Sequence, residues 1–468
     1  MLDFLPANDL PFHFQPDQIF WIDTDLDQTI SYRQLFIDLA STIKNRLPLA
    51  GVSIYSELVE WLAAIVTGQP ELILPSDSQG NLKAELQWRV RSPDCIVSLD
   101  QFSCGEMALS QWQAMILNSP TRILLATSGS TGMQRQFWHS VGSLTRGVQM
   151  DSKHWQDVWG LAYPPNHLAG LQVLFQALLN GNRLVKLYGQ SVDLIHQNLA
   201  DQQVSHLSCT PTFLRMLLSS DHVHASLMRL TNGGERYDSQ LDANIVRMFP
   251  NAGRRNIYAA TETGNLLSSD NEQFKVPDKL RNLLKIVDDQ LWLHRSLRRP
   301  QAGEIKESET KERETKHLEK NETVHPKVSP SASTTASTTA STSDLATEFW
   351  PTGDRVEIVS EEPLTIRFLS RTSEGFNVAG NRVDPLQLEQ VARQHPMVVD
   401  AKFYGVPNSL TENLVGCDLM IDPQGSQTWD EPEFRQWLQS QLERHELPRI
   451  IRLVNQMPMN RTTKLDRR

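Results

Sequence analysis

Residues 301–348 cannot take part in a hydrophobic core. They include no Phe, Trp or Tyr, they carry a charge run over 304–320, and they repeat Ser-Thr-Thr-Ala twice over 333–340. A segment of this composition buries too little apolar surface to offset the entropy of ordering its chain. We therefore predict a disordered insertion here, which leaves folding to the residues on either side. Its role stays open between a tolerated surface loop and a regulated tether.

Composition limits the functional class. A chain of 468 residues favours two or more domains, and a formal net charge of −10 argues against general nucleic-acid binding, which needs a basic face. The four cysteines form no Cys-x-x-Cys pair, the N-terminus lacks the basic start of a signal peptide, and no apolar run approaches the about 18–20 residues of a membrane span. We expect a cytoplasmic protein without a membrane span or a nucleic-acid partner; its oligomeric state stays open.

Apolar runs and amphipathic stretches alternate before the insertion. The pattern predicts helices at 31–47 and 171–179 and strands at 122–126, 184–187 and 256–259. Such alternation is typical of an α/β domain with a largely parallel sheet. After the insertion, strands at 364–369 and 401–406 and a helix at 432–446 indicate a small α+β domain.

A loop of glycine and hydroxyl residues directly follows the strand at 122–126. It consists of Thr127, Ser128, Gly129, Ser130, Thr131 and Gly132. Two glycines let the backbone curl, and hydroxyl and amide groups can then donate hydrogen bonds to phosphate oxygens. The loop lacks the Gly-Lys-Ser/Thr ending of a Walker loop, and taken alone such a stretch is more often an ordinary turn.

Further motifs follow in a fixed order. They are Gly233-Gly234-Glu235, Tyr258-Ala259-Ala260-Thr261-Glu262, Trp350-Pro351-Thr352-Gly353-Asp354, Arg371 within Ser370-Arg371-Thr372-Ser373, Gly380–Pro385 before a helix with Glu389, and Lys464 near the C-terminus. Each one has a structural interpretation, such as a turn aspartate or a solvated lysine. Together and in this order they resemble the adenylate-forming (AMP-binding) superfamily of acyl-CoA synthetases, peptide-synthetase adenylation domains and beetle luciferases.

The resemblance implies a role for each matching residue. The loop 127–132 would wrap the ATP phosphates, the turn 233–235 would pack along adenine, and Tyr258 would stack on adenine. Thr261 would contact the α-phosphate and Glu262 would be the magnesium ligand. The remaining implied roles are ribose binding by Asp354, ribose and phosphate contact by Arg371, catalysis of adenylation by Lys464, and a structural role for Glu389.

The same resemblance implies an architecture and a reaction. We expect a large N-terminal domain over 1–370, with α/β subdomains and a small β-barrel, and a mobile C-terminal domain over 371–468 that rotates about Ser373. The reaction would use ATP, Mg²⁺ and coenzyme A to convert a carboxylic acid first to an acyl-adenylate and then to a thioester. Magnesium and a lysine would neutralise the charge that builds on the transferred phosphate.

Several positions depart from the superfamily pattern. Gln134 and Arg135 stand where Pro-Lys is usual, and arginine keeps the charge without the geometry of lysine. Ala259, Ser370 and Thr463 each replace a usual glycine, and Ser373 stands at a hinge that is commonly Asp or Lys. None of these changes removes a catalytic side chain. They leave open a catalytically idle relative that binds nucleotide or a partner.

The stretch Pro164–Leu171 resembles an acyl-pocket segment, in which His167 would gate or line the pocket. In this stretch and in its short length, the chain is most similar to the o-succinylbenzoate–CoA ligases of menaquinone and phylloquinone synthesis. Arg135, Arg146 and Arg236 are then candidates for a second substrate carboxylate. Another small acyl- or aryl-CoA ligase, or an adenylation domain that charges a carrier protein, stays an alternative.

Overall fold

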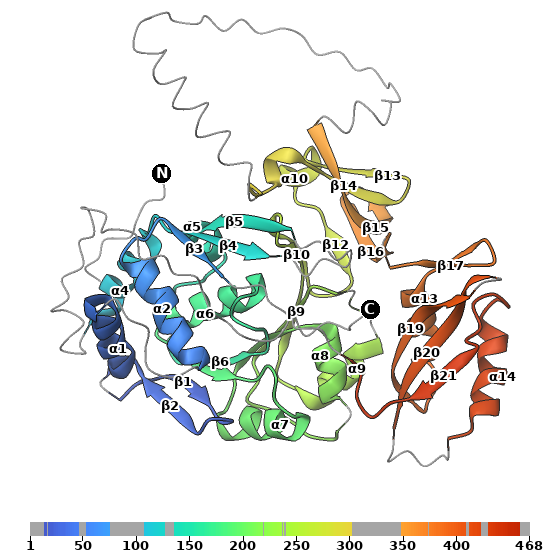
Figure 1. Cartoon of the computed structure of the whole chain (residues 1–468), viewed down its shortest axis with the longest axis horizontal. Helices are drawn as coiled ribbons and strands as arrows, with labels where there is room; N and C mark the ends of the chain where they lie inside the picture. The colour runs from blue at the N-terminus through green and yellow to red at the C-terminus, as the bar shows by residue number, and fades with distance from the viewer. Residues whose placement is uncertain are drawn as a thin grey trace, which may run out of the picture.

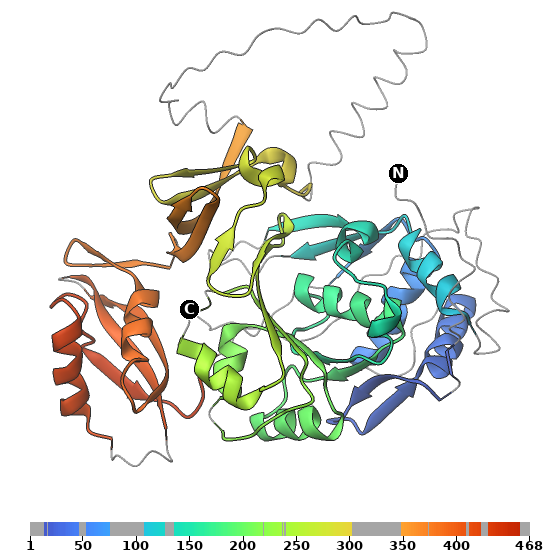
Figure 2. The same ribbon diagram turned by 180° about the vertical axis from the view of Figure 1, so that it is seen from behind.

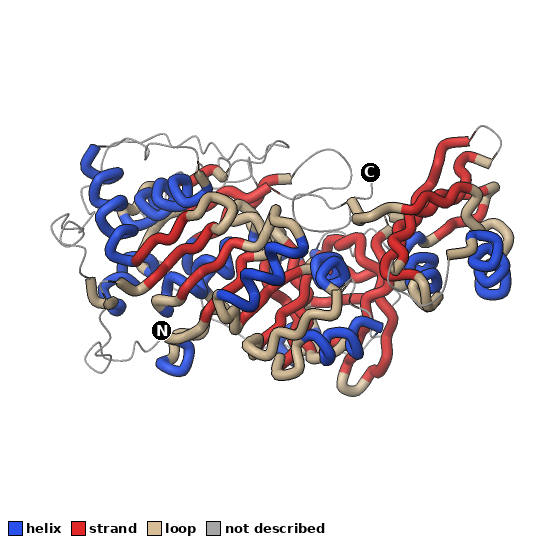
Figure 3. The backbone as a smooth tube through the Cα atoms, turned by 90° about the horizontal axis from the view of Figure 1, so that it is seen from below, coloured by secondary structure: helices blue, strands red, loops and turns tan. Residues whose placement is uncertain are grey.

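The computed structural model describes most of the chain. The described residues are 14–15, 17–45, 53–74, 107–126, 135–218, 220–235, 237, 240–301, 348–372, 374–408, 411–422 and 429–458. The insertion predicted at 301–348 lies outside them, apart from its two end residues. The fold is mixed α/β, with a large N-terminal domain and a smaller C-terminal domain at one end of the molecule (Figures 1 and 3). The predicted boundary at 370/371 stays a prediction.

An eight-stranded sheet forms the centre of the large domain. Its order is β11 (Gly264–Ser269), β10 (Gly253–Ala260), β9 (Arg229–Gly233), β8 (His206–Cys209), β6 (Val158–Leu161), β7 (Arg183–Lys186), β1 (Ile19–Asp23) and β2 (Gln28–Ser31). The strands from β10 to β1 are parallel, and the edge strands β11 and β2 are antiparallel. The prediction of a largely parallel sheet is confirmed.

Helices cover both faces of this sheet (Figures 1 and 2). One core contains side chains of α1 (Tyr32–Asn45), α2 (Ile54–Val66), α4 (Leu109–Leu117) and α6 (Leu168–Asn180). The other contains side chains of α7 (Val192–Asp201), α8 (Pro211–Leu217) and α9 (Gln240–Met248). Neighbouring residues of a strand point to opposite faces, so Leu184 packs in the first core and Val185 in the second. This two-sided burial explains the continuous apolar runs of the strands.

Two smaller sheets complete the large domain. The strands β3 (Glu71–Ile73), β4 (Arg122–Ala126) and β5 (Gln136–Ser140) form one, beside α5 (Val141–Thr145). Where a small β-barrel is expected, the described strands form an antiparallel sheet with β12 and β13 at its edges. Its order is β12 (Gln273–Lys275), β16 (Leu364–Arg371), β15 (Phe349–Glu361), β14 (Gln290–His294) and β13 (Leu284–Val287), with α10 (Asp278–Arg281) nearby.

The small domain is α+β, as predicted. It contains the hairpin β17 (Phe376–Val378) and β18 (Asn381–Val383), the helices α13 (Pro385–Ala392) and α14 (Glu431–Gln441), and a sheet of β19 (Val398–Asn408), β20 (Glu412–Ile421) and β21 (Ile450–Leu453). Glu389 is fully buried, where its carboxylate accepts a hydrogen bond from the Phe403 amide at 3.1 Å and pairs with Arg393 at 3.3 Å. This geometry agrees with a structural role for Glu389.

Local signals explain where the helices begin and end. His167 caps the start of α6, and Gly181 ends it in the left-handed conformation (φ 66°), as its position in the sequence predicts. Thr210 and Asp384 accept hydrogen bonds at the starts of α8 and α13, each followed by a proline. The helix predicted over 432–446 ends earlier, at Gln441, because Leu442 adopts an extended conformation. Among the described residues, no helix is long and apolar enough to span a membrane.

Three histidine side chains, those of His196, His222 and His224, stack on one another near α8. His196 and His224 are buried, and their rings meet through a 2.9 Å Nδ1···Nε2 contact, while His222 stacks on His196 at 4.3 Å. Burial, and secondly the two neighbouring rings, lower the pKa of His196 to about 4. Burial also lowers the pKa of His224. Protonation of His196 and His224 therefore opposes the folded state.

We predict that the free energy of unfolding falls as the pH drops from about 6.5 to about 4, because His196 and His224 take up protons in the unfolded chain that they do not bind in the folded protein. Each proton taken up on unfolding contributes a slope of about 1.4 kcal/mol per pH unit. Urea unfolding at several pH values should show a shallower slope for His196→Gln than for the unchanged chain. Parallel slopes would contradict this account.

Candidate functional site

Three predicted site residues meet where the central sheet joins the antiparallel sheet. The Tyr258 hydroxyl, from β10, donates to Asp354 Oδ2 at 2.7 Å, and Arg371 Nε, from β16, donates to Asp354 Oδ1 at 2.7 Å. Asp354 is buried on β15, while half of the Arg371 side chain is exposed. A charge-assisted network thus links strands that are almost one hundred residues apart in sequence.

Strand register and one glycine hold Asp354 in place. Asp354 lies directly opposite Arg371 in the β15–β16 pair. Gly353 adopts φ +80°, a conformation that favours glycine, and its carbonyl accepts from the Thr372 amide at 2.8 Å. The Thr352 hydroxyl accepts from the Asp354 amide at 3.0 Å. The Thr-Gly-Asp order therefore turns the backbone so that the carboxylate faces Tyr258.

The charges of this network reinforce one another. The Asp354 carboxylate is the largest influence on Arg371 and raises the pKa of its guanidinium. Burial, and then Asp354, raise the pKa of Tyr258, so its hydroxyl stays protonated and can donate. One face of the Tyr258 ring stacks on Phe368, with centroids 4.1 Å apart and planes at 24°. The side chain remains partly exposed.

Thr261 and Glu262 lie in the turn that joins β10 to β11, directly after the strand that carries Tyr258. The amide of Arg299 donates to the Glu262 carbonyl at 2.6 Å. On the other side of the turn, the buried His139 of β5 lies against the Thr261 backbone. Burial, and secondly Arg299, lower the pKa of His139 to about 4, so this imidazole is neutral at pH 7. The turn is therefore held from two sides, with the Glu262 side chain partly exposed.

The segment Gly233-Gly234-Glu235 ends the neighbouring strand, β9. A Cβ on Gly233 would lie 3.2 Å from the Ile257 carbonyl oxygen, so this position favours glycine. Gly234 has φ +84°, and the Glu235 carboxylate accepts from the Thr212 amide at 3.0 Å, at the start of α8. A carboxylate at a helix N-terminus is stabilised by the helix dipole. Glu235 thus fixes the turn against α8.

His167 begins α6 and lies next to this turn. Its Nδ1 accepts from the Ala169 amide at 3.3 Å, and its ring stacks on Tyr163 at 5.9 Å. The Tyr163 hydroxyl in turn contacts the Gly233 carbonyl at 3.4 Å. A Cβ on Gly170 would lie 2.1 Å from the Pro164 carbonyl oxygen, so the Pro-Pro turn can approach α6 only over a glycine. The candidate acyl-pocket segment is therefore coupled to the turn 233–235.

Other predicted site residues lie outside the described part of the chain. These are the loop 127–132 with Gln134, the candidate Arg236, the hinge Ser373, and Lys464 with Thr463. The paired strand ends Ala126 and Gln136 flank the loop, and Arg135 is exposed just before β5. The predictions for the undescribed residues stay predictions.

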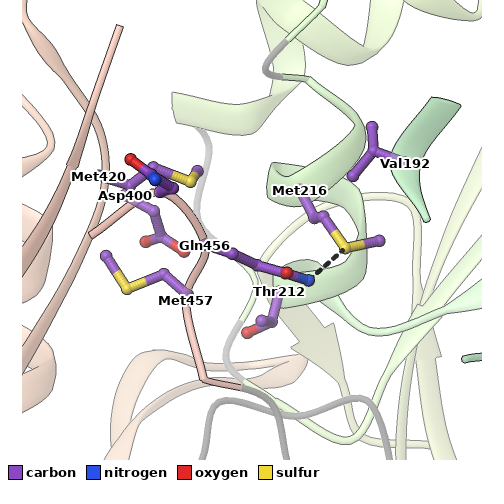
Figure 4. A pocket seen from close by; sticks show the side chains of 8 residues that line it. Val192, Thr212, Met216, Asp400, Met420, Gln456 and Met457 are labelled. Carbon is purple, nitrogen blue, oxygen red and sulfur yellow. Dashed lines mark hydrogen bonds between the residues drawn. The ribbon is translucent and has the colours of Figure 1, made fainter. Parts of the chain in front are cut away.

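The two domains meet at α8. Gln456, after β21, extends toward Thr212 and Met216 of α8, and Asp400, Met420 and Met457 line the same small pocket from the small domain (Figure 4). The Gln456 side-chain amide lies 3.9 Å from the Met216 sulfur. This amide–sulfur contact is weak, so it suits two domains that can separate. The amide of Thr212, in the first turn of the same helix, is the donor to Glu235.

Sequence reasoning missed several residues of this site. Phe368 stacks on Tyr258, Arg299 contacts the Glu262 turn, and His139 supports Thr261. Phe368 lies in a predicted strand, three residues before Arg371. Its stacking on Tyr258 of β10 could not be predicted, because it depends on how the two sheets meet. Neither His139 nor Arg299 belongs to a motif, so a single sequence offers no signal for them.

Comparisons with known proteins agree with this geometry. The AMP-binding enzyme family matches residues 76–291, and the AMP-binding enzyme C-terminal domain matches residues 387–464. A 2-succinylbenzoate–CoA ligase from Bacillus licheniformis is 24% identical over 354 residues, which cover 74% of this chain and 68% of the relative.

Solved structures share the fold. An o-succinylbenzoate CoA synthetase from Bacillus subtilis, in complex with an acyl-adenylate intermediate, superposes with a TM-score of 0.53 at 16% identity, over 96% of this chain and 94% of that chain. ATP-bound MatB from Rhodopseudomonas palustris gives a TM-score of 0.59 at 17% identity, over 99% and 95%. With both domain families matched in order along one sequence, the chain belongs to the family of AMP-binding enzymes.

Proposed function

We propose that this chain is an ATP-dependent acid–CoA ligase. In the first half-reaction a substrate carboxylate oxygen attacks the α-phosphorus of ATP, and the bond to pyrophosphate breaks. In the second, the coenzyme A thiol attacks the acyl carbon and AMP leaves. The observation that carries the proposal is the buried Asp354 carboxylate between Tyr258 and Arg371, beside the Thr261–Glu262 turn.

Asp354 has capacity left for a ribose. A carboxylate offers about four lone-pair positions, and Tyr258 and Arg371 occupy two of them. Two vicinal ribose hydroxyls can donate to the others and so set the register of the nucleotide. The free part of the Tyr258 ring would then lie against adenine, in line with the turn 233–235.

The turn 261–262 would receive the phosphates. Mg²⁺ prefers oxygen ligands, and the partly exposed Glu262 carboxylate beside the Thr261 hydroxyl offers that chemistry. When bound, the ion would neutralise phosphate charge. The neutral His139 and the Arg299 amide hold the turn in place, so that the Thr261 hydroxyl can contact the α-phosphate. The exposed half of Arg371 can contact ribose and phosphate.

We predict that Asp354→Asn weakens AMP binding by about 10- to 100-fold, because hydrogen bonds to a charged group contribute about 1.5–3 kcal/mol. Tyr258→Phe, which removes one donor and keeps the ring, should weaken it by about 10-fold or less. Titration with a fluorescent AMP analogue measures both. Glu357→Gln is the matched control, because Glu357 lies on the same strand and pairs with Arg367. Equal affinity in Asp354→Asn and the control would exclude the ribose role.

Lys464 would act in the first half-reaction alone. We place the domain boundary at 370/371, so that the small domain begins at Arg371 and carries Lys464 to the nucleotide when it closes. The weak contact of Gln456 with α8 supports a mobile arrangement, in which rotation about Ser373 then admits coenzyme A (Figure 4). Closure that assembles a site is a known gating device.

Lys464→Ala should reduce acyl-adenylate formation by about 10²-fold or more, since one lost transition-state donor costs that much in comparable sites. Thioester formation from a pre-made acyl-adenylate should stay near normal. Ser373→Pro, which stiffens the hinge, should show the reverse. Rapid-quench measurements of each half-reaction separate the two effects; equal damage to both half-reactions in both variants would reject this division.

The substrate we propose is o-succinylbenzoate, which has one carboxylate to activate and one to bind. The relative from Bacillus licheniformis carries that activity in its name, and the segment around His167 resembles the corresponding pocket. The spare carboxylate needs a cationic partner because an unpaired buried charge is costly. Arg146, at the end of α5, lies close enough to Arg299 to lower the pKa of its guanidinium, after the larger effect of burial. These two like charges favour an anion beside the turn 261–262.

The protein should convert o-succinylbenzoate with ATP, Mg²⁺ and coenzyme A, and should discriminate against benzoate and octanoate by about 10⁴-fold or more, as a purpose-built polar site does. Mass detection of the thioester across these acids tests this. Arg146→Gln should raise the KM for o-succinylbenzoate but not for benzoate, whereas Arg33→Gln, on the exposed face of α1, should change neither.

The outcome separates the alternatives. If octanoate or benzoate is the better substrate, the enzyme is another acyl- or aryl-CoA ligase and the o-succinylbenzoate proposal is wrong. If no acid yields a thioester while AMP still binds, the chain is a catalytically idle relative.

A further inference from the structure

A second cluster of ligand-type side chains lies at the opposite end of the central sheet. His154 ends a short 3-10 helix (Ser152–His154), Asp157 directly precedes β6, and His206 is the first residue of β8. The candidate site lies beyond the other ends of these strands, where Tyr163 follows β6 and Thr210 follows β8. The cluster is therefore separate from the nucleotide site and takes no part in the proposed reaction.

The ligand atoms of the cluster converge. Asp157 Oδ2 lies 2.9 Å from His154 Nδ1 and 3.4 Å from His206 Nε2, and one atom of each residue lies within 4.8 Å of the other two. Tetrahedral ligands with metal bonds of about 2.1 Å lie about 3.4 Å apart, so small side-chain rotations close the set around one ion. The three side chains are only 12–20% exposed.

Neighbouring groups orient the ligands. Ser205 Oγ lies 2.9 Å from His206 Nδ1 and accepts from the Val158 amide at 2.8 Å, so it can hold the His206 ring with Nε2 toward Asp157. The indole of Trp159 packs on the same ring, with centroids 4.8 Å apart. On the other side, the Asn182 amide donates to the His154 carbonyl at 2.6 Å. His206 is therefore held through its second ring nitrogen, as metal-binding histidines usually are, whereas His154 is held through its backbone.

The charge of the set suits a divalent cation. One carboxylate and two neutral imidazoles leave a net charge of −1, with Arg229 of β9 opposite His206 in the strand register. The positive charge of Arg229 repels a cation. Tight binding of an ion therefore requires direct coordination by the three side chains, and not only attraction by nearby negative charge. The alternative is a purely structural arrangement in which Asp157 accepts hydrogen bonds from both rings. His154 Nε2, which is buried without a partner among the described residues, is unpaired in both arrangements, so the convergence of Nδ1, Oδ2 and Nε2 of the three residues is what favours an ion.

We propose that His154, Asp157 and His206 bind a zinc-type divalent transition-metal ion, with the fourth position open to water. Two nitrogens and one carboxylate oxygen are ordinary ligands of zinc. The ion would tie the connection before β6 to the start of β8 and so stabilise the large domain, because a ligand that binds only the folded state favours it.

Equilibrium dialysis of the chelator-treated full chain against ZnCl₂, without nucleotide, tests the proposal. We expect Asp157→Asn and His206→Gln each to bind one zinc ion fewer per chain than the unchanged protein, because the affinity of this site for zinc falls by about 10-fold or more. Two controls should keep it: His222→Gln, in the stacked histidine cluster, and Glu262→Gln, at the proposed magnesium position.

Cobalt binding provides a second measurement, which does not depend on the number of zinc ions bound per chain. Co²⁺ bound to the unchanged chain should show the intense visible absorption of a four-coordinate site, and Asp157→Asn should lose it while its circular dichroism stays that of the folded protein. Zinc stoichiometry equal in all four variants, or loss of an equivalent in the controls alone, would overturn the proposal and leave the cluster as a hydrogen-bonded structural group.

Discussion

The buried Asp354 carboxylate determines how the parts of the large domain meet. Left alone, such a group would be costly to bury, but it accepts from Tyr258 on one oxygen and from Arg371 on the other. Tyr258 belongs to the central sheet, whereas Asp354 and Arg371 belong to the antiparallel sheet. The same carboxylate therefore joins two sheets, positions the aromatic ring beside the turn 261–262, and holds Arg371, the last residue of β16, two residues before the predicted hinge.

The remaining site features follow from where the parallel strands end. Segments after β6, β8 and β9 supply His167, Thr210 and the turn 233–235, and β10 continues into Thr261 and Glu262. In open α/β sheets ligands bind beyond the carboxyl ends of the strands. Two close approaches make this arrangement possible, the Pro164 carbonyl over Gly170 and the Ile257 carbonyl over Gly233. Glu235, at the start of α8, links the same region to the helix that the small domain touches.

Much of the fold can be predicted from the sequence, because the sequence patterns that indicate its helices and strands are local. The strand at 122–126, the end of α6 at Gly181 and the alternation of strands and helices all follow from short-range patterns. Motif order also indicates Tyr258, Asp354 and Arg371 as site residues. The contacts among these three residues cannot be predicted from motif order, because the contacts depend on the order of strands in two sheets. For the same reason the stacking of Phe368, the support of Thr261 by His139, and the convergence of His154, Asp157 and His206 have no signal in a single sequence.

The central claim is that the network around Asp354 holds a nucleotide whose α-phosphate reacts with a carboxylic acid. Exchange of labelled pyrophosphate into ATP, measured on the purified full chain with and without added acid, reports that step without requiring coenzyme A. The account predicts exchange that depends on o-succinylbenzoate and on Mg²⁺, and that is negligible when the acid is omitted. Exchange that is absent with every acid tested, from a folded chain that binds AMP, would contradict it.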